Sequence, residues 1–284
     1  MTELRRRMDD DMVARGLTDR TRESYLWAVA GLAQFYRRRP DQIADEEVKT
    51  YLVHLLRERR LSSSTCNVVA SGLRFFYRVT LKRDHTTFDI PLSRKPGKLP
   101  VILSREEVER VIARATPLKH RTMLLTIYAA GLRLNEVLHL RVTDVDSGRM
   151  TIRVEQGKGR KDRYTVLAPR LLDELRRYWA LERPQNWLFP SARTAAPLDP
   201  SALQRAYHVA KRRAGVTKPG GLHGLRHAFA THLLEAGVDL HTIQRLLGHE
   251  HLTTTTRYFQ LTRHTEIGPD SPLDLLARFA PPAR

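Results

Sequence analysis

The stretch His223–Tyr258, HGLRHAFATHLLEAGVDLHTIQRLLGHEHLTTTTRY, decides how the rest of the chain is interpreted. His223 and Arg226 lie one helical turn apart, so a helix that begins near Gly224 would point both side chains into one cleft. Apolar residues at helical spacing follow, and Gly248 is typical of a helix end. Polar groups set into an apolar segment in this way indicate an active site.

Two more polar side chains follow that glycine. A continuous helix would hold His249 and Tyr258 ~13 Å apart, given a rise of about 1.5 Å per residue. The run Thr253–Thr256 makes such a helix unfavourable, because β-branched and hydroxyl-bearing residues prefer caps and turns. A chain that turns at these threonines brings His249 and Tyr258 together.

The residues needed to complete the site lie upstream. In YAAGLRLNE, an apolar helix ends at the glycine and Arg133 begins a new one. Glu136, one turn later, is predicted to support the Arg133 side chain from behind. Residues 151–167 alternate like a two-stranded hairpin, and the polar loop QGKGRKD between its strands places Lys158 at the tip.

These motifs and their order resemble those of the tyrosine recombinase family, also called phage integrases, and most closely its compact branch with the bacterial Xer recombinases. The resemblance covers essentially the whole chain. It implies a site-specific DNA recombinase that forms a covalent 3′-phosphotyrosyl intermediate, needs no metal, cofactor or ATP, and acts as a homo-tetramer on two DNA duplexes. The residues that carry it are Arg133 (GLRLNE), Lys158 (GKGRKDR), His223 and Arg226 (HGLRH), His249 (LGHE) and Tyr258 (TTRYF).

The chemistry of phosphodiester cleavage needs cations and an acid. The phosphate gains a second negative charge as a nucleophile adds, so fixed positive charge must surround its oxygens. Arg133 and Arg226 suit this role, because guanidinium is always charged and matches two oxygens at once. Lys158 is the predicted proton donor to the leaving sugar oxygen, since ammonium can deprotonate and guanidinium cannot.

The predicted nucleophile is Tyr258. About one tyrosine in a thousand is ionised at pH 7, a handicap of ~4 kcal/mol that neighbouring cations and a base must offset. His223 is the predicted base or proton relay, and His249 is predicted to hydrogen-bond the phosphate.

The composition points to the same partner. The chain has 284 residues, and 49 Lys+Arg against 31 Asp+Glu give a net charge of +18. Such an excess indicates a polyanion, double-stranded DNA above all, although a highly charged surface or a ribosome-associated protein fits composition alone. Cys66, the single cysteine, excludes an intramolecular disulfide. No apolar run of about 18 residues predicts a membrane span, so a cytoplasmic location is expected.

The expected architecture is mainly α with a small β-sheet, in two domains. Residues 1–88 are predicted to form a helical, SAM-like DNA-binding bundle, and 89–100 a linker rich in proline and cations. Residues 101–268 form the predicted α+β catalytic domain, which begins with a capping box from Ser104 to Glu107. By resemblance, the tail 269–284 is exchanged between protomers; taken alone, it is a helix that docks on its own domain.

Helices are predicted over residues 21–38 and 46–59, and a third is capped by the serines at 62–64. Val68, Val69, Leu73, Phe76 and Tyr77 are predicted to face inward on the third. Cations collect at the ends and outer faces of these helices and of one over 200–215, where they are either solvated charge or phosphate contacts. The candidate DNA contacts are Arg37, Arg38, Arg74, Arg78, Lys82, Arg94, Lys95, Arg205, Lys211 and Arg212.

Three alternatives remain open on the sequence alone. His223 and His227, four residues apart, could ligate zinc, although no adjacent carboxylate motif completes such a site. A type IB topoisomerase would use nearly the same residues without site preference. A basic DNA-binding accessory protein would retain the fold without catalysis. His227, His232 and His251 are interpreted as structural.

Overall fold

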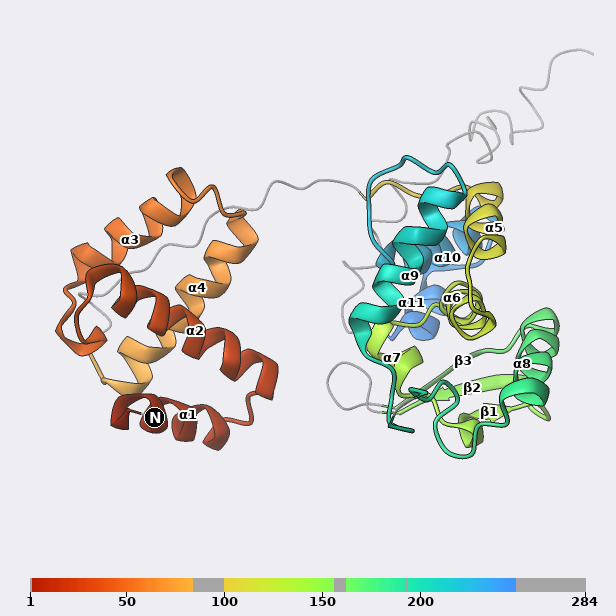
Figure 1. The fold of residues 1–284 in the computed structure, drawn as a ribbon, viewed down its shortest axis with the longest axis horizontal. Coiled ribbons are helices and arrows are strands. Elements are labelled where there is room, and N and C mark those ends of the chain that lie inside the picture. Colours follow the sequence, from red (N-terminus) through yellow and green to blue (C-terminus); the bar gives the residue numbers. More distant parts are fainter. Residues whose placement is uncertain (1, 84–99, 156–161, 193, 249–284) are drawn as a thin grey trace, which may run out of the picture. The chain divides into compact units, whose positions relative to one another are not determined.

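The computed structural model describes residues 2–83, 100–155, 162–192 and 194–248, and the chain divides into two units, Met1–Gly97 and Lys98–Arg284. The described residues are mostly helical and contain one three-stranded sheet (Figure 1), which confirms the predicted fold class. Within these residues, no helix combines the length and the hydropathy needed to cross a bilayer.

The described part of the first unit is a helical bundle around one apolar core. The three predicted helices are confirmed to within a few residues, and Ser62 caps the third by accepting a hydrogen bond from the Thr65 N–H. The elements are α1 (Glu3–Ala14), α2 (Asp19–Tyr36), η1 (Pro40–Gln42), α3 (Asp45–Arg57), α4 (Ser63–Phe75) and the π-helical turn η2 (Phe76–Thr80).

Two features of this bundle differ from the prediction. The helix α1 is not among those named from the sequence, since only Met8 and Met12 in its charged run reach the core. Val68 is 44% exposed, whereas Val69 and Leu73 are buried. Adjacent residues of a helix point about 100° apart, and the buried stripe of this helix runs through Val69 and Ala70, so Val68 falls outside it.

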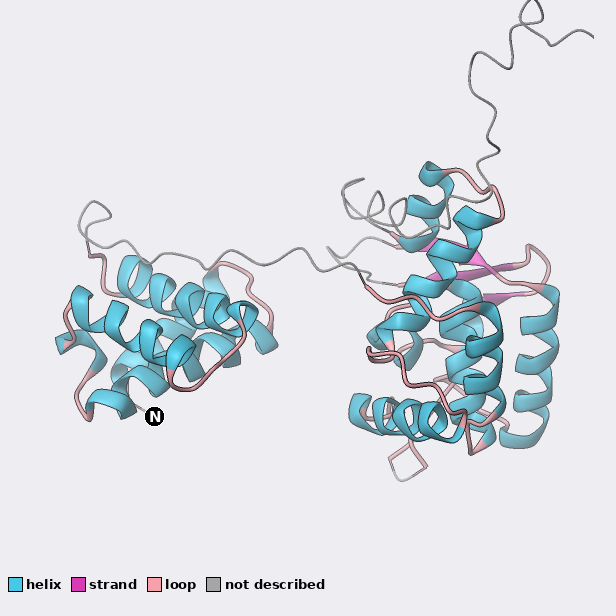
Figure 2. Cartoon of the chain, turned by 90° about the horizontal axis from the view of Figure 1, so that it is seen from above, coloured by secondary structure: helices cyan, strands magenta, loops and turns pink. Residues whose placement is uncertain are grey.

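The second unit contains the sheet and the other described helices, and Figure 2 shows the strands in magenta among the helices in cyan. The predicted capping box is present, because the Ser104 N–H donates to Glu107 and the Glu107 N–H to Ser104. The elements are α5 (Arg105–Ala113), α6 (Leu118–Ala130), α7 (Leu134–Leu138), η3 (Val142–Asp144), β1 (Val145–Asp146), β2 (Thr151–Val154), β3 (Arg163–Val166), α8 (Pro169–Glu182), α9 (Pro200–Arg213), α10 (His223–Glu235) and α11 (Leu240–Leu247).

Helix α6 is the central element of this unit. It packs against α5, α8, α9 and α10, and its buried residues lie around much of its circumference. A helix with this pattern belongs in the interior. It ends at its C-cap Gly131, whose φ of 62° is left-handed, and α7 starts at Leu134 with Arg133 as its N-cap, close to the predicted start. The turn between α6 and α7 therefore sits deep in the fold.

The sheet is antiparallel in the order β1-β2-β3. Val154 pairs with Arg163 and Thr151 with Val166, which confirms the predicted hairpin. Strand β1, of two residues, was too short to be predicted. In β3 the side chains alternate, with Thr165 buried and Tyr164 exposed. Arg163 and Thr165 therefore share the face that meets the helices.

Replacement of Gly131 at the end of α6 is predicted to destabilise the fold. A Cβ there would lie 2.5 Å from the Phe229 ring, in addition to the left-handed backbone. Gly215 has a similar φ of 65° with nothing within 4 Å, so it is the matched control. Gly215→Ala should cost about 1 kcal/mol of unfolding free energy. Gly131→Ala should cost roughly 1–3 kcal/mol more, measured by urea denaturation; equal losses would contradict the steric argument.

Candidate active site

Three of the predicted site residues meet at the turn between α6 and α7. Arg133 is the residue before α7, and His223 and Arg226 lie in the first turn of α10. Their common neighbour is Glu136, whose Oε1 accepts from Arg133 Nη1 at 2.7 Å and whose Oε2 lies 3.6 Å from Arg226 Nη1. The predicted contact between Arg133 and Glu136 is therefore present.

Arg226 is held by the ends of two helices. It is 1% exposed, and its Nη1 donates to the Gly131 carbonyl at 2.6 Å while its Nη2 donates to the Leu247 carbonyl at 2.6 Å. Carbonyls at helix C-termini lack intrahelical donors and carry partial negative charge, so a guanidinium satisfies them well. Arg226 thereby ties the end of α6 to the end of α11.

A fifth residue of the site, Arg163 in β3, was not predicted. Its Nη1 and Nη2 donate to the two oxygens of Glu136 at 2.8 and 2.7 Å, and its Nε donates to the Leu246 carbonyl at 3.0 Å. In the sequence it ends a polar run in a chain rich in arginine, so only the register of the hairpin distinguishes it. We refer to Arg133, Glu136, Arg163 and Arg226 as the Glu136 cluster.

The Glu136 cluster holds three guanidinium groups against one carboxylate, an excess of two positive charges. Burial alone would raise the pKa of Glu136, but hydrogen bonds and charge from Arg163, then the N–H and guanidinium of Arg133, outweigh it and lower the pKa to about 2. Glu136 is thus ionised throughout the neutral range. The remaining positive charge is available for an anion, and Arg133 is its most exposed source, with 25% of its side chain accessible.

The two histidines beside this cluster both have lowered pKa values. His223 is exposed as a residue, yet its ring packs edge-on against His227 with centroids 4.5 Å apart. Loss of solvation, followed by the charges of Arg226 and Arg133, lowers the pKa of His223. Burial, His223 and Arg226 lower the pKa of His227 to about 4. A neutral His223 can accept a proton, as the predicted base must.

The other histidine assignments have different outcomes. His232 is buried and its Nδ1 lies 2.9 Å from the Tyr128 hydroxyl, in keeping with the structural role predicted for it. Across the described residues, no group of three or more His, Cys, Asp or Glu side chains is arranged to hold a metal ion. Lys158, His249, His251 and Tyr258, together with Arg94 and Lys95, lie outside the described residues.

The remaining candidate DNA contacts differ in exposure. Arg37, Arg38, Lys82, Arg205 and Arg212 are exposed, and Arg74 and Arg78 are half-buried. Arg38 forms an ion pair with Glu47.

The prediction that Lys211 contacts DNA is wrong. Lys211 is 8% exposed, and its Nζ donates to the carbonyls of Lys218 and Gly220, so it stabilises the loop before α10 and does not face a phosphate.

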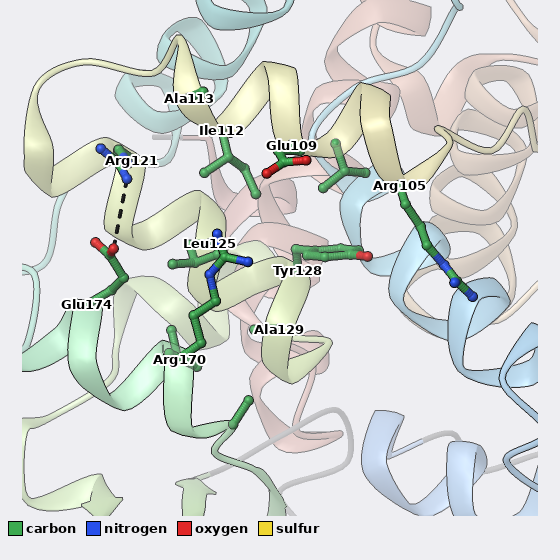
Figure 3. A pocket seen from close by; sticks show the side chains of 13 residues that line it. Arg105, Glu109, Ile112, Ala113, Arg121, Leu125, Tyr128, Ala129, Arg170 and Glu174 are labelled. Carbon is green, nitrogen blue, oxygen red and sulfur yellow. Dashed lines mark ion pairs between the residues drawn. The ribbon is translucent and has the colours of Figure 1, made fainter.

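A separate cavity of about 400 Å³ lies between α5, α6 and α8 (Figure 3). Ile112 and Leu125 belong to its apolar wall, and an ion pair of 3.9 Å joins Arg121 to Glu174 beside it. None of the predicted site residues lines this cavity, so the Glu136 cluster remains the candidate active site.

Comparisons with known proteins agree with this site. Residues 102–264 match the phage integrase family, and residues 4–87 match the N-terminal SAM-like domain of phage integrases. A putative integrase/recombinase of Sinorhizobium fredii is 45% identical over 99% of this chain and 92% of its own length. The tyrosine recombinase XerA of Thermococcus kodakarensis is 37% identical over 75% of this chain and 76% of its own.

The fold is also that of a solved recombinase. A lambda integrase tetramer bound to a Holliday junction is similar with a TM-score of 0.71 and 18% identity, over 89% of this chain and 75% of the other. A buried carboxylate shared by three arginines on this fold is consistent with an enzyme that breaks and rejoins DNA strands. The chain belongs to the phage integrase family, the tyrosine recombinases, and is a site-specific recombinase. The topoisomerase and accessory-protein alternatives are not favoured.

Glu136→Gln should destabilise the fold in a pH-dependent way. The pKa of Glu136 is lowered from 4.5 to about 2 on folding. Its ionised form therefore contributes about 3 kcal/mol above pH 4.5, and this contribution is lost as the pH falls toward 2. Urea denaturation at pH 7 and at pH 3 should show a larger difference in unfolding free energy between the unchanged protein and Glu136→Gln at pH 7. An equal difference in unfolding free energy at both pH values would contradict the proposed contribution of the Glu136 carboxylate.

The matched control for that measurement is Glu155→Gln. It removes a half-buried carboxylate that pairs with Arg153 in the same sheet region. Because surface ion pairs contribute little, its effect should stay below about 1 kcal/mol.

Proposed function

We propose that this recombinase cleaves DNA by attack of the Tyr258 phenol on a phosphodiester held at the Glu136 cluster. The observation that supports the proposal is the excess positive charge of that cluster, whose arginines come from the N-cap of α7, from α10 and from β3 and surround one ionised carboxylate. A preorganised cation site is what a phosphate needs as its charge rises in the transition state.

The two arginines act at different depths. Arg133 is accessible enough to contact an equatorial phosphate oxygen. Arg226 is 1% exposed, so in this conformation it acts on a phosphate through its charge, in an interior where water screens little. Direct contact by Arg226 requires that the residues over it part when DNA binds.

The remaining steps are assigned from the sequence. The Tyr258 oxygen bonds to phosphorus as its proton passes to His223, and the bond to the 5′ oxygen breaks as Lys158 protonates that oxygen. His249 donates a hydrogen bond to the phosphate. The products are a 3′-phosphotyrosine and a free 5′-hydroxyl. The phosphodiester energy is conserved, so the 5′-hydroxyl of another strand reverses the step without ATP.

The assembly follows from strand exchange. Joining two duplexes requires four cleavages, so we propose that four protomers act on two duplexes, in line with the lambda integrase tetramer on a Holliday junction. In this proposal residues 1–88 contribute to DNA binding, residues 89–100 form the linker and residues 101–268 carry out catalysis. The tail 269–284 is the segment proposed to pass to a neighbouring protomer.

Tyr258→Phe should abolish covalent capture of DNA. A nicked duplex traps the intermediate, because the short fragment with the 5′-hydroxyl diffuses away before rejoining. The unchanged protein should give a denaturation-resistant adduct at the 3′ phosphate, and Tyr258→Phe none, with equal DNA binding by gel shift. An adduct that persists in Tyr258→Phe would refute the nucleophile assignment. Sequencing the captured DNA would identify the target site.

Arg133→Ala should separate cleavage from binding. Loss of a contact made mainly in the transition state should lower the cleavage rate at saturating DNA by ~10³-fold or more, with affinity within roughly tenfold. The contrast is Arg205→Ala, on the exposed face of α9, which should weaken binding without slowing the bound complex. Parallel losses of rate and affinity in Arg133→Ala would make Arg133 a general backbone contact.

A further inference from the structure

Arg163 makes contacts with two segments that are far from it in the sequence. Its guanidinium fork binds both oxygens of Glu136, at the start of α7, and its Nε binds the Leu246 carbonyl, near the end of α11. The side chain is 10% exposed, so these bonds form in a site with little water. Such charge-assisted, bidentate pairs fix geometry more firmly than a single bond does.

The strand that carries Arg163 is fastened to the same region a second time. Thr165, on the same face of β3, donates its hydroxyl to the Ala130 carbonyl at 2.9 Å, at the last residue of α6. One strand thus contacts the ends of α6 and α11 and the beginning of α7.

Gly248 shows how closely Arg163 fits against the end of α11. A Cβ on Gly248 would lie 2.7 Å from Arg163 Cδ, and its φ of 61° is left-handed. The Gly248 carbonyl also accepts from Arg133 Nη2 at 3.2 Å. Only glycine lets the backbone turn there and leaves room for the Arg163 stem, while its carbonyl orients the arginine that faces the phosphate.

We propose that Arg163 is a positioning residue, which sets the orientation of Arg133 by clamping Glu136 and the end of α11 to the β3 strand. Without the fork, Glu136 keeps the bonds from the Arg133 N–H and guanidinium and the ion pair with Arg226, but it is no longer fastened to β3. The carboxylate that supports the Arg133 side chain is then held less firmly. Arg163 itself touches no substrate. This inference rests on the proposed role of Arg133 at the phosphate.

The test is the cleavage rate of Arg163→Met and Arg163→Lys at saturating DNA, with trapped adduct as the readout. Misplacing a phosphate ligand by about 1 Å costs ~10²-fold in rate, so Arg163→Met should slow cleavage by that factor. Arg163→Lys keeps the charge without the fork and should still lose ~10-fold or more. A Lys variant as fast as the starting protein would overturn the proposal, because charge alone would then suffice.

Coupling to Glu136 distinguishes positioning from a general structural role. If Arg163 acts through Glu136, the double variant Arg163→Met, Glu136→Gln should cleave about as slowly as the slower single variant. If the double variant instead loses the product of the two single-variant losses in cleavage rate, the proposal is wrong. All rates are compared well below the lowest melting temperature, and if Arg163→Met does not fold, Arg163→Lys with Glu136→Gln carries the same comparison.

The matched control is Arg153→Met. It removes one cation from β2 of the same sheet, where Arg153 pairs with Asp144 and Glu155 and does not touch Glu136. It should leave the cleavage rate at saturation within about threefold, and its effect should multiply with that of Glu136→Gln. Failure of Tyr258→Phe to abolish adducts would refute the proposed function; a normal rate in Arg163→Met with an inactive Tyr258→Phe would refute this inference alone.

Discussion

The structure of the second unit depends on one buried carboxylate that is shared among three arginines. Glu136 accepts hydrogen bonds from Arg133 and Arg163 and lies 3.6 Å from Arg226. Desolvating four charged groups is costly unless each is paired and hydrogen-bonded. One negative charge cannot neutralise three positive ones, so the fold tolerates an unbalanced site that an incoming phosphate would balance.

Backbone carbonyls at helix ends supply the other hydrogen-bond acceptors of the arginines. The cations of the cluster are satisfied by backbone carbonyls at two helix C-termini, Gly131 after α6 and residues 246–248 in and after α11. Those carbonyls carry partial negative charge, which stabilises guanidinium without neutralising it. The N-terminus of α10 begins at the same place, and the positive end of its helix dipole favours an anion. Backbone dipoles therefore hold the arginines and attract the phosphate together.

Sequence spacing was enough to find residues that share one helix or one turn, and not those that depend on tertiary register. Arg133 with Glu136, and His223 with Arg226, are close in sequence and were identified. Arg163 was missed, because its function follows from which face of β3 meets α7 and α11. The same limit explains Lys211, which falls on the buried face of α9 while Arg212, one residue later, is exposed. A basic residue cannot be assigned to DNA or to the core by charge alone.

The geometry also separates catalysis from site selection. Among the described residues, the contacts given for the Glu136 cluster lie within the second unit, and its cationic groups are guanidinium groups that bind oxygen atoms. Such groups bind any phosphate and carry no information about the adjacent base. A recombinase that cuts at one site must therefore distinguish sequences with side chains outside the cluster, and the cluster's task is to react only with the phosphate that those contacts present.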